Sequence, residues 1–247
     1  MPNQIDGRTG VILAAGFGSR LAGVDDETDL KPLTTVHGIP LIYRTIRSLS
    51  IAGCEKVVIV LGYGYEEIKE DILASYTGET PITFAKNEQY DLSNGISVLA
   101  ASPQVEGEFV LTMADHILSD EMMLLAKSHK PPVDGATLLV DHKVDEIFDM
   151  DDATKVLSKD NKIKKIGKQI TEYNCIDTGV FICTQKLMEA IKIVYEKKGD
   201  ASLSDGIQTL ADRGRMHTLN IGDAFWQDVD TPEMLAHAEK LLEAEES

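Results

Sequence analysis

Residues 11–21 read VILAAGFGSRL, and a Lys31-Pro32 pair follows ten residues further along the chain. The apolar start of this stretch predicts a buried strand, and the small residues after it predict a tight turn. Small residues let a backbone approach a ligand closely, and the N–H groups of such a turn suit phosphate oxygens. Arg20 and Lys31 add two positive charges. The stretch therefore predicts an anion site at the end of a strand.

Two common phosphate-binding motifs do not fit this stretch. The chain contains no G-x-x-x-x-G-K-[ST] string, which excludes a P-loop. A dinucleotide-binding fingerprint needs a glycine where Leu21 stands, so an NAD-dependent oxidoreductase is a poor alternative. A ligand-free turn would explain the glycines by themselves. The combination of the strand, the small-residue turn, Arg20 and Lys31 favours a site for nucleotide phosphates.

The composition is that of an acidic chain of one-domain size. Its 247 residues include 24 Lys and Arg against 41 Asp and Glu, which gives a net charge of −17. We expect a single domain, with residues 1–130 mainly binding a nucleotide and residues 131–247 mainly binding an acceptor. An acidic chain without a basic run argues against nucleic-acid or anionic-membrane partners. It does not exclude a triphosphate, for which such a chain would be expected to use a divalent metal.

Cysteine content and hydropathy bear on the compartment. Cys54, Cys175 and Cys183 lie far apart in or beside apolar sequence, and they match neither a metal-ligand spacing nor a closed set of disulfides. Free buried thiols indicate a reducing compartment. No apolar stretch approaches the ~20 residues of a membrane span, and residues 1–10 lack a signal-peptide core. We therefore expect a soluble cytoplasmic protein.

The first half of the chain alternates predicted strands and helices. Strands are expected at 10–16, 56–61, 81–86 and 108–113, and helices at 40–52, 66–76, 94–101 and after Ser119. This βαβ alternation predicts a Rossmann-like, doubly wound parallel sheet. Ligands of such sheets bind at the carboxyl ends of the strands, and both the glycine turn and Asp115 fall at strand ends.

The second half has a different rhythm. Strands are expected at 136–140, 177–183 and 216–221, a hairpin from 153–157 and 162–166, and helices at 184–197, 203–213 and from Pro232 onward. These pieces predict additional, mostly antiparallel strands that carry an acceptor site. The expected fold class is therefore α/β with a mixed sheet.

Three aspartates are candidate metal ligands. Asp115 ends a hydrophobic strand, while Asp228 and Asp230 are two residues apart on an extended segment and can face one side. A solvated strand-end aspartate and a helix-capping pair are the plain alternatives. Beside a phosphate site, however, these carboxylates suit Mg²⁺, which takes one or two protein carboxylates and completes its shell with phosphate and water. Asp115 and Asp228 are the preferred pair, and Asp230 is the reserve.

Other polar residues are open to two readings. Asn94, Gly95 and Ser97 open a short helix, where Asn94 is either an N-cap or, with Ser97, a contact to a base or ribose. Lys168 is a solvated lysine or a site residue beyond the hairpin. His116 is expected to be a packing or hydrogen-bonding neighbour of Asp115 rather than a ligand. No arrangement of nucleophile and histidine indicates covalent catalysis.

At this point the motifs resemble those of the sugar nucleotidyltransferases. LAAGFGSRL with Lys31-Pro32 is similar to their signature loop, and Asp115 with the W-x-D ending at Asp228 is similar to their metal positions. Strings at 112–116, 152–156, 166–168, 173–179 and 226–231 look like the CTP:inositol-1-phosphate cytidylyltransferases within that family. The resemblance implies Mg²⁺-dependent transfer of a cytidylyl group from CTP to inositol 1-phosphate, giving CDP-inositol and pyrophosphate.

The resemblance also implies a role for each matching residue. The implied catalytic residues are Arg20, Lys31 and Lys168. The implied nucleotide contacts are Leu13, Ala14, Ala15, Gly16, Gly18, Ser19, Arg20, Lys31, Asn94, Gly95, Ser97 and Asp115. The implied acceptor contacts are Lys168, Asp177, Thr178 and Gly179, and the implied metal ligands are Asp115, Asp228 and Asp230.

Several alternatives stay open. The same chemistry would serve phosphocholine, a phosphonate or a sugar 1-phosphate as the acceptor. A regulatory module that binds CTP without turnover belongs to another class, and it need not keep Arg20, Lys31, Asp115 and Asp228 together. The connection from Arg20 to Lys31 is longer and more acidic than is usual in the family, as in a lid or a second cation site. Some relatives are fused to a membrane synthase for the next step, and a homodimer is compatible with the sequence.

Overall fold

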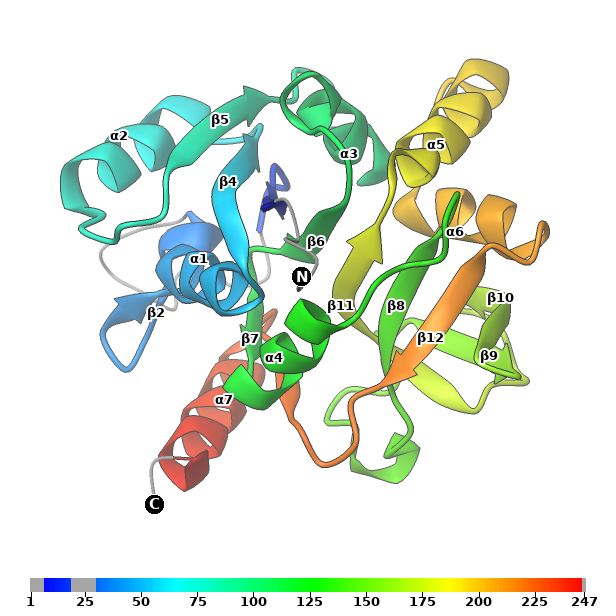
Figure 1. The fold of residues 1–247 in the computed structure, drawn as a ribbon. Coiled ribbons are helices and arrows are strands. Elements are labelled where there is room, and N and C mark those ends of the chain that lie inside the picture. The colour runs from blue at the N-terminus through cyan, green and yellow to red at the C-terminus, as the bar shows by residue number, and fades with distance from the viewer. Residues whose placement is uncertain (1–6, 19–29, 246–247) are drawn as a thin grey trace, which may run out of the picture.

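A nine-stranded mixed sheet forms the centre of the computed structural model, which describes residues 7–18 and 30–245 (Figure 1). The strand order is β5-β4-β1-β6-β11-β8-β12-β10-β9. The first four strands in this order are β5 (Ile82–Lys86), β4 (Cys54–Leu61), β1 (Arg8–Ala14) and β6 (Phe109–Met113). The other five are β11 (Cys175–Cys183), β8 (Ala136–Asp141), β12 (Met216–Asn220), β10 (Lys162–Gly167) and β9 (Lys155–Lys159).

The first four strands confirm the predicted parallel half. β1 pairs in parallel with β4 on one side and with β6 on the other, and β4 pairs in parallel with β5. All seven residues of β1 are buried, as expected for a strand covered by helices on both faces. The carboxyl ends of β1 and β6 therefore lie side by side, with Leu13 opposite Met113.

The second half adds antiparallel strands, as predicted. β11 runs antiparallel to both β6 and β8, while β12 pairs with β8 in parallel. β9 and β10 form the predicted hairpin, whose turn residues Asp160 and Asn161 both have positive φ. Because β11 joins directly to β6, the two halves share one continuous sheet, and the carboxyl ends of β1 and β6 lie on the same side of it as the amino-terminal part of β11.

Seven helices in the described residues surround the sheet. Apolar residues of α1 (Leu41–Ile51), α2 (Tyr65–Ser75) and α4 (Asp120–Ser128) form a buried core on one face. Those of α3 (Gly95–Ala101), α5 (Gln185–Lys198) and α6 (Leu203–Ala211) form another core on the opposite face. α7 (Pro232–Glu245) packs in a smaller cluster with Val36, Leu41, Ile117 and Val229. In the described residues no helix is both long and apolar enough to cross a membrane.

Two small sheets were not predicted. β2 (Thr35–Val36) pairs with β3 (Ile39–Pro40), and β7 (His116–Leu118) pairs antiparallel with β13 (Trp226–Asp228). Strands of two or three residues carry too little periodic pattern to be recognised in a sequence. The second pairing is important for the site, because its register places Asp228 opposite His116.

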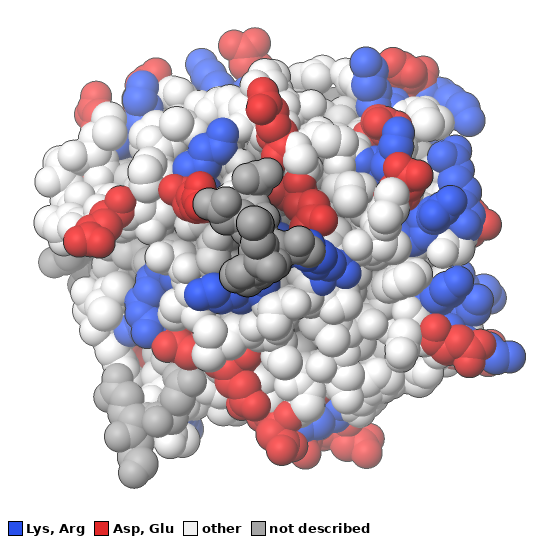
Figure 2. All heavy atoms as spheres, in the orientation of Figure 1, with Lys and Arg blue, Asp and Glu red and all other residues white. Residues whose placement is uncertain are grey.

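Charge is distributed unevenly over the surface. The β9–β10 hairpin and the residue after it, 155–168, contain six lysines and one aspartate in a chain whose net charge is −17. Figure 2 shows Lys and Arg side chains gathered toward the edge of the molecule where α5, α6 and this hairpin lie in Figure 1. The acidic surplus therefore lies elsewhere on the protein.

Thr112 on β6 offers a test of the core. Its hydroxyl is buried without a hydrogen-bond partner, whereas the hydroxyl of Thr178, equally buried, donates to the carbonyl of Leu139 at 2.8 Å. An unsatisfied buried hydroxyl destabilises the native state. Thr112→Val is therefore expected to raise the free energy of unfolding by about 1 kcal/mol.

Thr178→Val is the matched control, because it removes a hydroxyl that is hydrogen-bonded. We expect it to lower the free energy of unfolding by about 1–2 kcal/mol, since the Leu139 carbonyl loses its partner. Chemical denaturation of both variants makes the comparison. Equal losses of stability in the two variants would contradict this account of Thr112.

Candidate active site

The glycine turn leaves the end of β1 and opens into solvent. The Ala15 carbonyl accepts a hydrogen bond from the Tyr63 N–H at 3.1 Å, which fixes the turn against the end of β4. A Cβ on Gly16 would meet no atom within 4 Å, so this position faces open space. Gly18 has φ of 64°, and a Cβ there would lie 2.4 Å from Cβ of Lys31. Glycine is favoured at this position because of its positive φ and because the Lys31 side chain packs directly against it.

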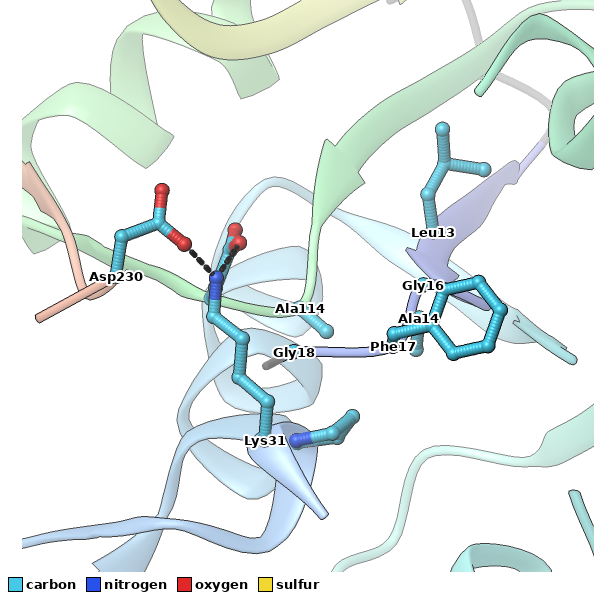
Figure 3. Close-up of a pocket in the computed structure, with 10 residues that line it drawn as sticks. Leu13, Ala14, Gly16, Phe17, Gly18, Lys31, Ala114 and Asp230 are labelled. Carbon is cyan, nitrogen blue, oxygen red and sulfur yellow. Dashed lines mark hydrogen bonds and ion pairs between the residues drawn. The ribbon is translucent and has the colours of Figure 1, made fainter. Parts of the chain in front are cut away.

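Lys31 lies between two carboxylates. It begins a short 3₁₀ helix, Lys31–Leu33, and its ammonium forms ion pairs with Oδ2 of Asp115 and Oδ1 of Asp230 (Figure 3). Burial opposes the charged form, but the two carboxylates outweigh it and raise the pKa of Lys31 above its usual value. The side chain is 12% exposed, so a fixed ammonium stands at the border of the cavity.

Asp115 is held from two sides. Its Oδ2 meets Lys31, and its Oδ1 lies 2.7 Å from Nδ1 of His116. Burial favours the neutral acid, but the charges of Lys31 and His116 hold the pKa of Asp115 well below its usual range. His116 also stacks on Trp226, with ring centroids 6.0 Å apart. The expected hydrogen bond between His116 and Asp115 is thus present.

Backbone hydrogen bonds bring the three aspartates together. The Ala114 N–H donates to the Leu13 carbonyl at 3.0 Å, which fixes the end of β6 against β1. The Val229 N–H donates to the Asp115 carbonyl at 2.8 Å, beside the β7–β13 pairing. Residues more than a hundred positions apart in the sequence, Asp115 and Asp228, therefore belong to one small unit.

Three adjoining pockets surround this unit. The loop pocket, about 390 Å³, is lined by Leu13, Ala14, Gly16, Phe17, Gly18, Lys31, Pro32, Ala114, Asp115 and Asp230. The α3 pocket, about 220 Å³, is lined by Leu13, Ala15, Gly16, Tyr90, Leu92, Asn94, Ser97, Met113 and Asp115. The β11 pocket, about 180 Å³, is lined by Met113, His116, Asp152, Ala153, Thr154, Lys168, Asp177, Gly179, Trp226, Asp228 and Asp230. Shared lining residues make the three pockets one continuous crevice.

The residues expected to contact the nucleoside are engaged with the protein. Oδ1 of Asn94 accepts a hydrogen bond from the Leu203 N–H at 2.8 Å, and Asn94 makes no side-chain cap on α3. The Ser97 hydroxyl lies 3.0 Å from Nδ2 of Asn87. Gly95 packs on Ala201, whose carbonyl would lie 2.4 Å from a Cβ at that position. Asn94 and Ser97 line the α3 pocket, while Gly95 has a packing role.

Of the residues expected to bind the acceptor, some line a pocket and one is buried in the core. Nζ of Lys168 lies 2.5 Å from Oδ1 of Asp152, and both line the β11 pocket with Asp177 and Gly179. The Thr178 side chain instead points into the core, so the structure does not bring it to the pocket. A Cβ on Gly179, where φ is 76°, would lie 2.5 Å from Nε2 of His116.

Two predicted residues, Ser19 and Arg20, lie outside the described residues, as does the acidic connection at 25–29. Their expected contacts with a triphosphate stay predictions. The sequence did not predict two other contacts of the site, which are the Lys31–Asp230 ion pair and the Asp152–Lys168 ion pair. Both ion pairs join residues from different strands or loops, so no local pattern in the sequence predicts them.

Two of the three aspartates, rather than all three together, suit a divalent cation. No group of three His, Cys, Asp or Glu side chains among residues 7–18 and 30–245 converges as a metal cage. The ammonium of Lys31 instead lies between Asp115 and Asp230 and pairs with both. Burial, helped by the charges of Asp115 and Asp230, raises the pKa of Asp228. A cation that takes one or two carboxylates would relieve this repulsion, so Asp115 and Asp228 fit Mg²⁺.

Asp177 is a second carboxyl with a displaced pKa. Burial raises its pKa to about 6, although Oδ1 accepts the Gly179 N–H at 2.8 Å. Because the native state holds this proton more tightly than the unfolded chain, the contribution of Asp177 to protein stability falls as pH rises from about 4 to about 6 and then levels off. Asn in this position keeps the acceptor oxygen and has no charge to bury.

Asp177→Asn is therefore expected to be neutral near pH 4 and to raise the free energy of unfolding by about 2 kcal/mol above pH 6.5. Urea denaturation of both proteins at pH 4, 5, 6, 7 and 8, with chelator present, measures this difference. A difference of the same size at pH 4 and pH 8 would show that Asp177 is not the titrating group.

The model for the MobA-like NTP transferase domain matches residues 10–145, more than half of the chain. This chain belongs to that family. The matched span contains the glycine turn, Lys31 and Asp115, and it ends beyond β8.

More particular similarities cover almost the whole chain. A solved structure of the inositol-1-phosphate CTP transferase from T. maritima is 30% identical, with a TM-score of 0.84 over 96% of this chain and 95% of that one. Bifunctional IPC transferase and DIPP synthase proteins of Thermococcus kodakarensis and Aquifex aeolicus are 34% and 33% identical over 94% and 95% of this chain. The chain spans about half the length of these two relatives.

Proposed function

We propose that this chain transfers a cytidylyl group from CTP to inositol 1-phosphate, giving CDP-inositol and pyrophosphate. The observation that supports the proposal best is the position of Lys31, a buried ammonium at the border of the loop pocket and between two carboxylates. The continuous crevice offers a place for a nucleoside, a triphosphate and an acceptor around that charge. The choice of CTP and inositol 1-phosphate draws on the similar proteins named above.

The three pockets suggest how the substrates divide the crevice. We assign the nucleoside to the α3 pocket, the triphosphate to the loop pocket and the acceptor to the β11 pocket. The first two are built mainly from residues before 130, and the third mainly from residues after 150. This division follows the expected nucleotide-binding and acceptor-binding parts of the chain.

The chemistry is an in-line substitution at the α-phosphorus. An oxygen of the acceptor phosphate forms the new P–O bond, the bond from the α-phosphorus to the bridging oxygen breaks, and pyrophosphate leaves. The acceptor is already an anion, so no general base is needed. The main obstacle is the repulsion between two anionic substrates, which positioned cations offset.

Two lysines of the crevice, Lys31 and Lys168, would offset this repulsion. Lys31 lines the loop pocket, and Lys168 lines the β11 pocket. On binding, phosphate oxygens would compete with Asp115 and Asp230 for Lys31, and with Asp152 for Lys168. Asp115 and Asp228 would hold Mg²⁺, which when bound supplies charge stabilisation to the phosphates. Arg20 is proposed as a further triphosphate contact.

A substrate panel tests the proposal. CTP, UTP, dTTP, ATP and GTP are each combined with inositol 1-phosphate, phosphocholine, a phosphonate and glucose 1-phosphate, and pyrophosphate release is measured with Mg²⁺. The proposal expects the highest kcat/KM for CTP with inositol 1-phosphate. A higher value for another acceptor would correct the substrate, and binding of CTP with no pyrophosphate release from any pair would favour a sensing module.

A further inference from the structure

One wall of the α3 pocket is a loop held by the other half of the chain. This wall segment, residues 87–94, connects β5 to α3 and contributes Tyr90, Leu92 and Asn94 to the pocket. Strand pairing holds only its first residue, because the Asn87 N–H donates to the Leu61 carbonyl at 2.8 Å and the rest of the segment lies between β5 and α3. Whatever holds it in place therefore also shapes the pocket.

Asp200 makes the densest set of contacts to the wall segment. Its Oδ1 accepts the Ser93 N–H at 3.0 Å, and its Oδ2 accepts the Ser93 hydroxyl at 2.8 Å. Oδ1 also accepts the Ala201 N–H at 2.7 Å, which fixes the carboxylate on its own loop. The hydrogen bonds to Ser93 lower the pKa of Asp200, so it is charged at neutral pH.

Further contacts join the same two segments. The Leu203 N–H, at the start of α6, donates to Oδ1 of Asn94 at 2.8 Å. The Tyr195 hydroxyl on α5 donates to Oε1 of Gln89 at 3.1 Å. Gly95 lets the backbone at Ala201 approach so closely that a Cβ would overlap its carbonyl oxygen. The wall segment is therefore attached through Gln89 to α5, through Ser93 to the connection between α5 and α6, and through Asn94 to the start of α6.

From these contacts we infer that Asp200 is a positioning residue for the nucleoside, because its carboxylate holds the wall segment against the connection between α5 and α6. Asp200 itself is not among the residues that line the α3 pocket, so it acts through Ser93 and its neighbours. The inference rests on the proposed function for its assignment of the nucleoside to this pocket. It adds a residue from the acceptor half of the chain to the recognition of the nucleotide.

The expected effect is on nucleotide binding rather than on chemistry. The wall segment contacts the nucleoside equally in the ground state and in the transition state, so loosening it removes uniform binding. Asp200→Ala is expected to raise KM and Kd for CTP about tenfold and to change kcat by less than about twofold. KM for inositol 1-phosphate is expected to stay within about twofold, since Lys168 and Asp177 are untouched.

Two variants distinguish this role from general loosening. Asp200→Asn keeps an acceptor for both N–H groups and offers its own N–H to the Ser93 hydroxyl, so it should restore most of the CTP affinity. Asp212→Ala is the matched control, because Asp212 also lies next to α6. Its side chain accepts a hydrogen bond from Nε2 of Gln208 at 2.8 Å rather than from the wall segment. Asp212→Ala should leave KM for CTP unchanged.

The experiment measures CTP binding by calorimetry without acceptor, and kinetics with each substrate varied, at a temperature where thermal melts show every variant folded. An unchanged Kd and KM for CTP in Asp200→Ala, or an equal loss in Asp212→Ala, would overturn the inference. Absence of CTP binding to the unmodified protein would instead reject the proposed function. Should Asp200→Ala not fold, Ser93→Ala removes only the hydroxyl contact and is expected to raise KM for CTP about threefold.

Discussion

Lys31→Ala is expected to lower kcat by roughly 10²–10³-fold, because it removes a positioned charge from the place where the transferring phosphates must lie. The ammonium is almost fully buried and kept protonated by Asp115 and Asp230, and among the described residues that line the loop pocket Lys31 is the only basic one. Water entering the vacated space would screen charge less well than a fixed cation. The loss should appear mainly in kcat, since charge stabilisation is needed most in the transition state.

The control is Lys186→Ala, which removes an exposed lysine that pairs with Glu189 on α5. It should keep full activity. Loss of Lys31 also leaves two carboxylates facing each other, so the thermal midpoint is expected to fall and activity must be assayed well below it. If folded Lys31→Ala retained near-normal turnover, the assignment of the loop pocket to the triphosphate would be wrong.

Gly179→Ala is expected to lower the free energy of unfolding by about 3 kcal/mol, from left-handed backbone strain and overpacking together. Its φ of 76° disfavours any side chain, and the new Cβ would lie 2.5 Å from Nε2 of His116. The imidazole cannot easily move away, because it is bonded to Asp115 and stacked on Trp226. Displacing it would disturb Asp115, so kcat should fall as well.

Gly107→Ala separates the two causes of this effect. Gly107 has a similar φ of 69°, but a Cβ there meets no atom within 4 Å. Gly107→Ala should therefore lower the free energy of unfolding by only about 1 kcal/mol, from backbone strain alone, and leave kcat unchanged. Urea denaturation and steady-state kinetics of both variants make the comparison. Equal destabilisation of the two would mean that His116 yields freely and does not anchor the site.

Much of the fold followed from periodic patterns. The apolar strands at 56–61 and 108–113 predicted a parallel sheet, and β4 and β6 both pair in parallel with β1. The alternating pattern and turn at 153–166 predicted the β9–β10 hairpin. These predictions succeeded because burial on one or two faces of a strand leaves a periodic record in the sequence.

The candidate site was predicted less completely, for two physical reasons. The β7–β13 pairing is only three residues long, so nothing periodic marked the contact that sets Asp228 beside His116. Lys31 pairs with Asp115 and Asp230, which lie 84 and 199 residues away in the sequence. Such ion pairs depend on how loops meet in space. Asp200 was missed for the same reason, since its bond to Ser93 crosses the two halves of the chain.

The most direct test of the account is the identity of the product. With Mg²⁺, CTP and inositol 1-phosphate, mass spectrometry and ³¹P NMR should show CDP-inositol with its new diphosphate linkage, formed in equal amount to pyrophosphate and formed far more slowly by Lys31→Ala. Release of CMP and pyrophosphate without a cytidine diphosphate ester would contradict the account, because the chain would then transfer the cytidylyl group to water rather than to an acceptor phosphate.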